Sequence, residues 1–322
     1  MTFHQTIIQP QSRSFSEPRV AIVHYWLVAM RGGERVVERL LKLFPNADLF
    51  THVYDPAAMS ATIRQAKVTT TFVNRLPFAK KAYQYYLPFM PMALEELDLT
   101  GYDIVISSES GPSKGVLTAP GSLHLCYCHS PMRYIWDHYY QYRKEANPLT
   151  KLAMSMTYPS IRQWDVTSSG RVDQFAANSN FIAQRIRKFW RREAEVIHPP
   201  VDTDLFTPSD VINDSYLWVG QLVPYKRPDL AVAAFNRNGL PLTIVGQGKM
   251  GASLRKIAGP NIRFIERMSF DDLRKAYAQS KALIMTAEED FGITSVESMA
   301  SGRPVIAYAS GGAMDTIVPN ET

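Results

Sequence analysis

Short apolar runs alternate with amphipathic stretches along most of this chain. Brief runs rich in Val, Ile, Leu and Ala are typical of strands that are buried on both faces of a sheet. We expect strands at 20–23, 48–53, 102–107, 123–128, 176–179, 195–198, 216–219, 242–245, 262–265 and 282–285. Amphipathic stretches and capping signals predict helices at 32–42, 148–165, 180–191, 228–237, 251–257 and 271–279. This alternation predicts parallel sheets with helices on both faces.

The alternation is interrupted at His198-Pro-Pro, because two prolines cannot continue a helix or a central strand. It then restarts. With 322 residues, the chain has the length of two domains of about 150 residues each. We therefore expect an α/β fold with two doubly wound, Rossmann-like domains, 18–199 and 200–322, that face each other across a cleft. The polar residues 1–17 are expected to form a mobile tail.

Composition narrows the class of protein. The chain is 46% hydrophobic and 20% charged, as globular proteins are. Its net charge of +5 and pI of about 9.1 favour anionic partners such as a nucleotide or an acidic membrane surface, while the scattered cations do not indicate nucleic acid. Cys126 and Cys128 share one strand face, which suits neither a zinc site nor a disulfide, so a reduced, cytoplasmic compartment is expected. No apolar run reaches the ~18 residues of a membrane span.

The most informative segment is 288–304, which follows an apolar strand and carries several acids before a helix. Thr294 and Glu297 have the spacing of a capping box, so Glu297 is expected in the first helical turn. Glu289 precedes it in the loop. Such a strand-loop-helix unit presents backbone N–H groups to the crevice above a sheet. A glutamate in a first turn can also stabilise a helix by ~0.3–1 kcal/mol without any further role.

The order of residues in and after this segment is distinctive. The acids, Phe291-Gly292-Ile293, Glu297, a small-residue helix, Gly302-Arg-Pro and then Ser310-Gly-Gly follow one another. This order, with seven residues between Glu289 and Glu297, resembles the signature of family 4 retaining glycosyltransferases. Those are two-domain enzymes with the GT-B fold.

The resemblance implies an activity and roles for these residues. The chain would move a hexose from a nucleotide-sugar donor to a hydroxyl of a glycan or lipid-linked saccharide, with retention at the anomeric carbon. Glu289 would support the reacting sugar, Glu297 would bind ribose hydroxyls, and the helix start at Phe291, Gly292 and Ile293 would hold the diphosphate. No metal or other cofactor is expected. The blocks 126–137 and 220–227 are most similar to bacterial mannosyltransferases of O-antigen and exopolysaccharide assembly, so GDP-mannose is the preferred donor.

Basic residues and glycines that follow the strands of the second domain are further candidates for donor binding. Lys226 can reach a diphosphate as a point charge, and Arg227 can fork two phosphate oxygens or remain solvated. The family often carries arginine where this chain has Gln221, so the usual pair of cations is incomplete. Gly246 belongs to a tight turn that suits the wall of a nucleotide pocket.

The first domain contributes two candidate features. Gly32 and Gly33 follow the first strand, where glycine lets the backbone approach a phosphate or sugar closely; a plain turn is the alternative. His129 follows the predicted strand 123–128, and the family carries a histidine near the transferred sugar at this place. A lone histidine is also often structural. We expect His129 to contribute a hydrogen bond or to handle a proton.

Two stretches combine aromatic and basic residues, 76–90 and 185–192. Both suit an anionic membrane surface, which would place the protein on the inner face of the plasma membrane, or they pack their apolar sides on the core. Asp202-Thr-Asp204 imitates a metal-binding D-x-D pattern, but it lies in the expected linker. No metal ligand is assigned.

Two other functions stay open at this point. Gln221 would suit a protein that binds a nucleotide-sugar without turnover, and a GT-B epimerase would open the donor without an acceptor. The family usually continues beyond the residues that end this chain, with a strand and several helices that return to the first domain. The resemblance therefore leads us to expect a truncated C-terminal end.

Overall fold

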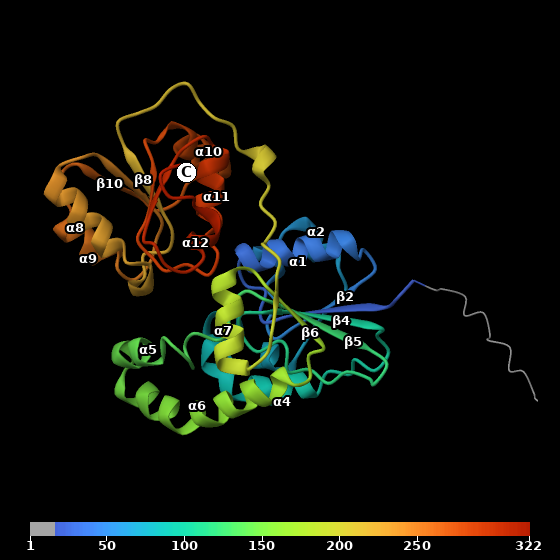
Figure 1. Ribbon diagram of the computed structural model, residues 1–322. Helices are drawn as coiled ribbons and strands as arrows, with labels where there is room; N and C mark the ends of the chain where they lie inside the picture. The colour runs from blue at the N-terminus through green and yellow to red at the C-terminus, as the bar shows by residue number, and fades with distance from the viewer. Residues whose placement is uncertain (1–16) are drawn as a thin grey trace, which may run out of the picture.

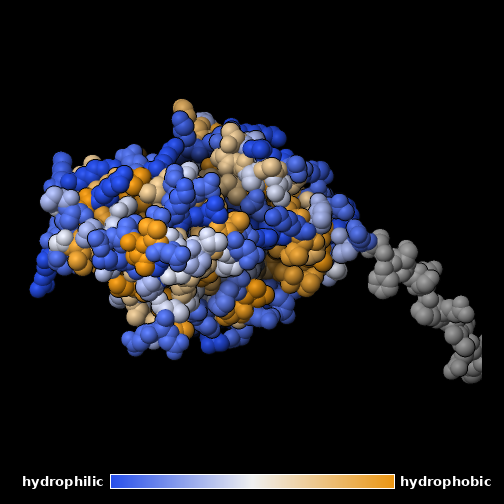
Figure 2. All heavy atoms as spheres, turned by 90° about the horizontal axis from the view of Figure 1, so that it is seen from above, coloured by the Kyte–Doolittle hydropathy of each residue, from blue (hydrophilic) through white to orange (hydrophobic). Residues whose placement is uncertain are grey.

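The computed structural model describes residues 17–322, so the tail expected at 1–17 lies outside the described residues apart from Glu17. Two α/β domains are each built on one parallel sheet, which confirms the predicted fold class (Figure 1). In Figure 1 the N-terminal domain lies below the orange and red C-terminal domain, and a yellow segment joins them. Seen from above, the surface is largely hydrophilic, with hydrophobic residues in separate patches (Figure 2).

The described residues form a seven-stranded N-terminal sheet in the order β3-β2-β1-β4-β5-β6-β7 and a five-stranded C-terminal sheet in the order β10-β9-β8-β11-β12. The N-terminal strands are β1 Val20–His24, β2 Asp48–Thr51, β3 Val68–Thr70, β4 Ile104–Glu109, β5 Leu123–Cys128, β6 Gln174–Ala177 and β7 Glu195–Val196. The C-terminal strands are β8 Tyr216–Val219, β9 Leu242–Val245, β10 Ile262–Ile265, β11 Leu283–Met285 and β12 Val305–Ala307. The winding direction reverses between β1 and β4 and between β8 and β11. Ligands of open parallel sheets bind at the carboxyl ends of strands at such points.

Helices pack around both sheets. Those of the N-terminal domain are α1 Gly32–Leu43, α2 Ala61–Gln65, α3 Ala79–Ala82, α4 Met90–Glu95, α5 Tyr139–Glu145, α6 Pro148–Ser169 and α7 Asn180–Trp190. Those of the C-terminal domain are α8 Pro228–Asn238, α9 Gly251–Ile257, α10 Phe270–Gln279, α11 Ile293–Ala300 and α12 Ala313–Thr316. None of the helices found in residues 17–322 has both the length and the apolar character needed to cross a bilayer.

Strand β1 shows why the N-terminal sheet is covered on both faces. Successive side chains of a strand point to opposite faces of the sheet. Ile22 packs in one buried cluster with Val37 and Leu41 of α1. Its neighbour Val23 packs in another with Leu94 of α4. A continuous apolar strand is what such two-sided burial requires.

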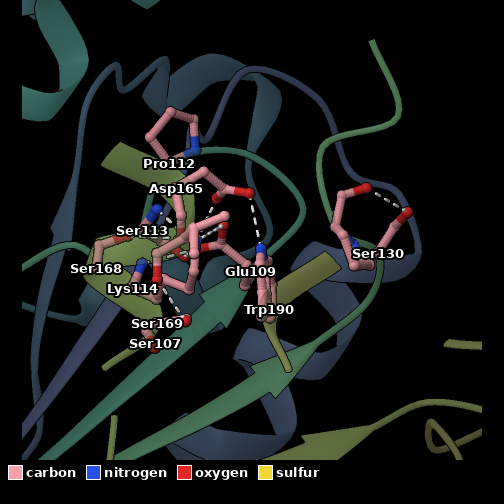
Figure 3. A network of polar contacts seen from close by, with 12 residues as sticks. Ser107, Glu109, Pro112, Ser113, Lys114, Ser130, Asp165, Ser168, Ser169 and Trp190 are labelled. Carbon is pink, nitrogen blue, oxygen red and sulfur yellow. Dashed lines mark hydrogen bonds and ion pairs between the residues drawn. The ribbon is translucent and has the colours of Figure 1, made fainter. Parts of the chain in front are cut away.

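A network of buried charges lies beyond the carboxyl end of β4 (Figure 3). Lys114 and Asp165 are both fully buried and form an ion pair, and the Lys114 Nζ lies 3.6 Å from Glu109 Oε1. The other Glu109 oxygen accepts from the backbone N–H groups of Ser113 and Lys114, each at 2.8 Å. Figure 3 shows these side chains directed at one another from separate elements.

Indole groups complete this network. The Nε1 atoms of Trp136 and Trp190 donate to Asp165 Oδ2 at 2.8 and 2.7 Å. Burial alone would lower the pKa of Lys114, but the charges of Asp165 and Glu109 raise it above its ordinary value. The lysine is therefore charged at neutral pH. It ties α6, through Asp165, and α7, through the Trp190 ring, to the end of β4.

Candidate functional site between the two domains

A cavity of about 330 Å³ lies between the domains. The N-terminal domain contributes Trp26, Arg133 and Tyr134 to its wall, and the C-terminal domain contributes Tyr225, Glu289 and Asp290. The C-terminal residues follow β8 and β11, the strands at the switch point of their sheet. The cavity therefore lies where the topology of that sheet favours a ligand.

Two glycines fix the loop that carries Glu289. The loop forms a parallel bridge with Gly311, and the Gly312 N–H donates to the Glu289 carbonyl at 2.7 Å. Gly311 has a φ of +68°, and a Cβ there would lie 2.4 Å from the Glu289 carbonyl oxygen. Only glycine permits both the conformation and this approach. The two glycines of the Ser310-Gly-Gly run therefore allow the backbone to pack closely against the loop that carries Glu289.

Lys226 pairs with Glu289, which lines the cavity, although the two residues lie 63 positions apart; Lys226 itself is not among the lining residues. The Lys226 Nζ lies 2.5 Å from Glu289 Oε1, and the two side chains are 21% and 20% exposed. Burial alone would lower the pKa of Lys226, but Glu289 raises it, so the amine is protonated at neutral pH. An anion that enters the cleft would meet the positive charge of Lys226, which in this structure is paired with the carboxylate of Glu289.

The expected capping box at Thr294 and Glu297 is wrong. Helix α11 begins at Ile293, and its N-cap is Gly292 with a φ of +90°, a conformation that favours glycine. Thr294 is consequently inside the helix and cannot cap it. The N–H of Ser295 donates instead to the Gly292 carbonyl at 2.9 Å. Glu297 falls in the second turn of α11, so its carboxylate does not complete a capping box and contacts other residues instead.

Those partners of Glu297 belong to both domains. The Tyr277 hydroxyl donates to Glu297 Oε2 at 3.0 Å, and Arg35 Nη1 of α1 lies 3.4 Å from Oε1. Glu297 is buried, and this burial raises its pKa. Sequence reasoning missed Arg35, because nothing local marks a contact between residues 262 positions apart.

Helices α1 and α11 meet across the domain boundary at their N-termini. A Cβ on Gly32 would lie 3.0 Å from Ile293 Cδ1, and one on Gly33 would lie 2.4 Å from the Tyr25 hydroxyl oxygen. A side chain at Gly33 would require the Tyr25 ring to move, and one at Gly32 would press on the end of the Ile293 side chain. Both helix starts carry partial positive charge, so the electrostatics of this boundary favour an anion.

His129 follows the carboxyl end of β5, as expected, but it does not line the cavity. Its Nε2 lies 2.8 Å from the Ser108 hydroxyl, which also contacts His24 Nδ1 at 3.0 Å. Burial, together with His24, lowers the pKa of His129 to about 3. The imidazole is therefore neutral at pH 7, where it can hydrogen-bond but is a poor proton donor.

Arg227 and Gly246 have structural partners outside the cavity. Arg227 is exposed, and its guanidinium pairs with Asp229 at 3.1 Å. Gly246 has a φ of +148°, and a Cβ there would lie 1.8 Å from the Gly220 carbonyl oxygen. The turn after β9 thus packs on the loop after β8. Only Lys226 of the predicted basic pair reaches Glu289.

Asp290 joins the domains through three residues of the N-terminal domain, one of which, Arg185, belongs to the segment 185–192. Arg133 and Arg185 both pair with its carboxylate, and Ser179 Oγ donates to its carbonyl oxygen at 2.5 Å. Arg185 is buried, and Trp190 is buried against Asp165. Of the two alternatives for 185–192, packing on the core holds for Arg185 and Trp190, whereas several cations of the same segment are exposed and their contact with a membrane stays a prediction.

The described residues hold no group of three or more His, Cys, Asp or Glu side chains placed to bind a metal ion. Asp202, from the D-x-D pattern, pairs with Arg39 of α1. Both cysteines are free and buried.

Solved structures share this architecture. Anabaena HepE in complex with UDP and glucose has a TM-score of 0.63 at 14% identity, over 94% of this chain and 83% of that one. Sucrose-phosphate synthase from Thermosynechococcus elongatus has a TM-score of 0.62 at 18% identity, over 95% and 84%. At these identities the likeness shows the fold, which is GT-B.

Curated relatives match shorter segments. A D-inositol 3-phosphate glycosyltransferase of Mycobacteroides abscessus is 28% identical over 171 residues, 46% of this chain and 37% of the relative. A Corynebacterium glutamicum protein, named GDP-mannose-dependent monoacylated alpha-(1-6)-phosphatidylinositol monomannoside mannosyltransferase, is 33% identical over 115 residues, 31% of this chain and 30% of the relative. The chain thus spans well under half the length of these two relatives.

Two family models divide the chain between them. The model described as glycosyl transferases group 1 matches residues 212–322, which include Lys226, Glu289 and Glu297. The model described as Glycosyltransferase Family 4 matches residues 30–205, more than half of the chain. The chain therefore belongs to glycosyltransferase family 4.

Proposed function

We propose that this chain is a retaining glycosyltransferase that moves a hexose from a nucleotide-sugar to a hydroxyl of a glycan or lipid-linked saccharide. The observation that carries the proposal is the Lys226–Glu289 pair at 2.5 Å in a cleft between two Rossmann-like domains. The cation suits a leaving diphosphate, and the carboxylate suits a sugar whose anomeric carbon gains positive charge. Membership of glycosyltransferase family 4 agrees with these roles of the cation and the carboxylate.

The leaving group determines most of the chemistry. Lys226 and the α11 N-terminus at Ile293 stabilise the departing diphosphate, as a divalent ion does in other transferases. Gly292 gives the turn before α11 the shape that exposes these N–H groups. Gly32 lets α1 approach the same region from the other domain. No metal or other cofactor is needed in this scheme.

The sugar and the acceptor meet at Glu289. Its carboxylate accepts hydrogen bonds from sugar hydroxyls and stabilises the oxocarbenium-like transition state. The acceptor hydroxyl attacks from the side of the leaving phosphate, and a phosphate oxygen takes its proton, so configuration is retained. The protein mainly positions the partners. His129, being neutral, serves by hydrogen bonding. Glu297 binds ribose only after Arg35 leaves it, because the two are paired here.

GDP-mannose is the donor that we propose. Support comes from the C. glutamicum relative, whose name specifies GDP-mannose and a mannosyltransferase. HepE holds UDP and glucose on a similar fold, so the base and the sugar are the features to test first. The acceptor is proposed to be a saccharide of O-antigen or exopolysaccharide assembly. A cytoplasmic location agrees with the two free cysteines.

Incubation with labelled nucleotide-sugars tests this function. With GDP-mannose and a suitable saccharide acceptor, we expect labelled product and GDP in equal amounts, with the configuration of the anomeric carbon retained. A matched reaction without acceptor should release little GDP. A donor recovered as its epimer without acceptor would indicate an epimerase instead. A donor that is bound but unchanged in every reaction would indicate a binding protein.

A further inference from the structure

A row of polar side chains crosses the N-terminal sheet at the carboxyl ends of β1, β4 and β5. The Ser108 hydroxyl lies 3.0 Å from His24 Nδ1 and 2.8 Å from His129 Nε2. His24 and Ser108 are direct partners in the register of β1 and β4, and both are buried. On the other side of His24, its Nε2 lies 3.8 Å from Glu34 Oε1 of α1. We call Glu34, His24, Ser108 and His129 the polar row.

The place of Glu34 in this row follows from the packing of α1 on the sheet. Ile22 and Ile106 pack in one cluster with apolar side chains of α1. His24 and Ser108 come two positions later on the same two strands, so their side chains lie on the same face as these isoleucines. The first turn of α1 brings the buried Glu34 to this face.

The hydrogen bonds of the row have one direction. A hydroxyl has a single hydrogen, so Ser108 donates to one imidazole and accepts from the other. His24 Nε2 is buried without a hydrogen-bond partner in residues 17–322, and the Glu34 carboxylate lies beside it. The negative charge favours a hydrogen on the nitrogen that faces it. His24 Nδ1 then accepts from Ser108, whose oxygen accepts in turn from the Nε2–H of His129.

This direction determines what His129 can offer to a ligand. Its lowered pKa makes His129 neutral, so the ring carries one hydrogen, and the row holds that hydrogen at Nε2. No hydrogen bond within residues 17–322 involves the other nitrogen, Nδ1, and His129 is only partly buried. The next residue, Ser130, lines the cavity. An imidazole nitrogen without a hydrogen accepts from a hydroxyl group.

We infer that the polar row holds His129 in the tautomer whose Nδ1 accepts a hydrogen bond from a hydroxyl of the transferred sugar. Glu34, His24 and Ser108 are then positioning residues, which touch no substrate and transfer no proton. The part of this inference that concerns the sugar rests on the proposed function; the tautomer does not.

Glu34→Gln tests the row and keeps the cap of α1. Glu34 Oε2 accepts from the Arg31 N–H at 2.9 Å, and a glutamine oxygen can take its place. The glutamine NH₂ group then faces His24 Nε2 as a donor. This change reverses each hydrogen bond of the row and places the hydrogen of His129 on Nδ1.

Nitrogen NMR of protein labelled at its histidines distinguishes the tautomers, because ring nitrogens with and without a hydrogen differ in chemical shift. Spectra are recorded at about pH 8, where imidazoles of ordinary pKa are neutral. His129→Gln assigns the signals. The wild type should carry the His129 hydrogen on Nε2, Glu34→Gln should carry it on Nδ1, and Ser108→Ala should show both tautomers. Glu38→Gln, which removes an equal charge one turn along α1, is the matched control and should resemble the wild type.

Two results would overturn the inference. One is a wild type with the His129 hydrogen on Nδ1, which decides the matter even where a variant does not fold. The other is the same His129 tautomer in the wild type, Glu34→Gln and Ser108→Ala, with thermal unfolding showing that both variants are folded.

Ligand binding separates this inference from the proposed function. Glu34→Gln should weaken binding of GDP-mannose or UDP-glucose about 3- to 10-fold, as expected for one neutral hydrogen bond, and leave the affinity for GDP or UDP unchanged. Equal losses with and without the sugar would contradict the contact between His129 and the sugar. The expected tautomers in a chain that binds no nucleotide-sugar would contradict the transferase and leave the row intact.

Discussion

Glu289→Gln should lower the rate of sugar transfer by about 10²–10³-fold while the chain stays folded, because one preorganised electrostatic group of the transition state is lost. Glutamine keeps the shape of the side chain and can still hydrogen-bond to a sugar hydroxyl. It cannot balance positive charge at the anomeric carbon. Initial rates at saturating donor and acceptor measure this loss. Thermal unfolding of the same sample checks that the fold is intact.

Glu288→Gln is the matched control for this variant. Glu288 is the preceding residue of the same loop, but its carboxylate accepts a hydrogen bond from Ser310 Oγ at 2.5 Å, and it does not line the cavity. We expect this variant to keep a rate near that of the wild type. Equal rates for Glu289→Gln and the wild type would show that Glu289 takes no part in sugar transfer. Equal losses in the two variants would assign the effect to the loop as a whole.

Lys114→Met should lower the free energy of unfolding by about 3–5 kcal/mol, because it leaves buried carboxylates without their cation. Asp165 and Glu109 are both fully buried, and the indole groups that remain near Asp165 are neutral. Urea unfolding at neutral pH measures the change. Lys281→Met is the control, since its exposed pair with Asp214 should contribute less than about 1 kcal/mol. Equal midpoints for Lys114→Met and the wild type would contradict the assigned role of the network.

The raised pKa of Lys114 also predicts the pH dependence of this contribution. A lysine whose folded pKa exceeds its unfolded value of about 10.4 binds its proton more tightly in the folded state. The contribution of Lys114 to the free energy of unfolding is therefore complete below a pH of about 10.4. It is lost only as the pH rises through the folded pKa. In Lys114→Met, burial raises the pKa of Glu109 without the lysine that lowers it, so the deficit relative to the wild type should not shrink between pH 7 and 9.

Much of the fold could be predicted from local patterns. The strands expected at 123–128, 216–219, 242–245 and 262–265 and the helix at 251–257 have these bounds in the structure. Each is an apolar run or a capped segment with clear breaks on either side. The helices α2, α3 and α4 were not predicted, because segments of four to six residues are too short to show a period. The strand expected at 195–198 ends at Val196, close to two prolines.

The site could be predicted only in part. Glu289 and Lys226 each follow a strand of the same sheet, and parallel topology brings the carboxyl ends of such strands together. No comparable pattern in the sequence predicts the contacts between the two domains. Arg133 reaches Asp290 across 157 positions of sequence, and the orientation of two domains cannot be read from periodicity. The same limit explains why the sequence left open whether 185–192 forms a surface or packs on the core; in the structure Arg185 and Trp190 turn inward.

Titration calorimetry of GDP and UDP tests most directly whether a nucleoside diphosphate binds beside Lys226. The wild-type chain should bind at least one of them, and Lys226→Met should weaken that binding about 10- to 100-fold, as expected for the loss of a charged hydrogen bond. Arg227→Met should bind like the wild type, because its guanidinium is already paired with Asp229. Equal affinities for the wild type and Lys226→Met, or no binding of either nucleotide by the wild type, would contradict this account.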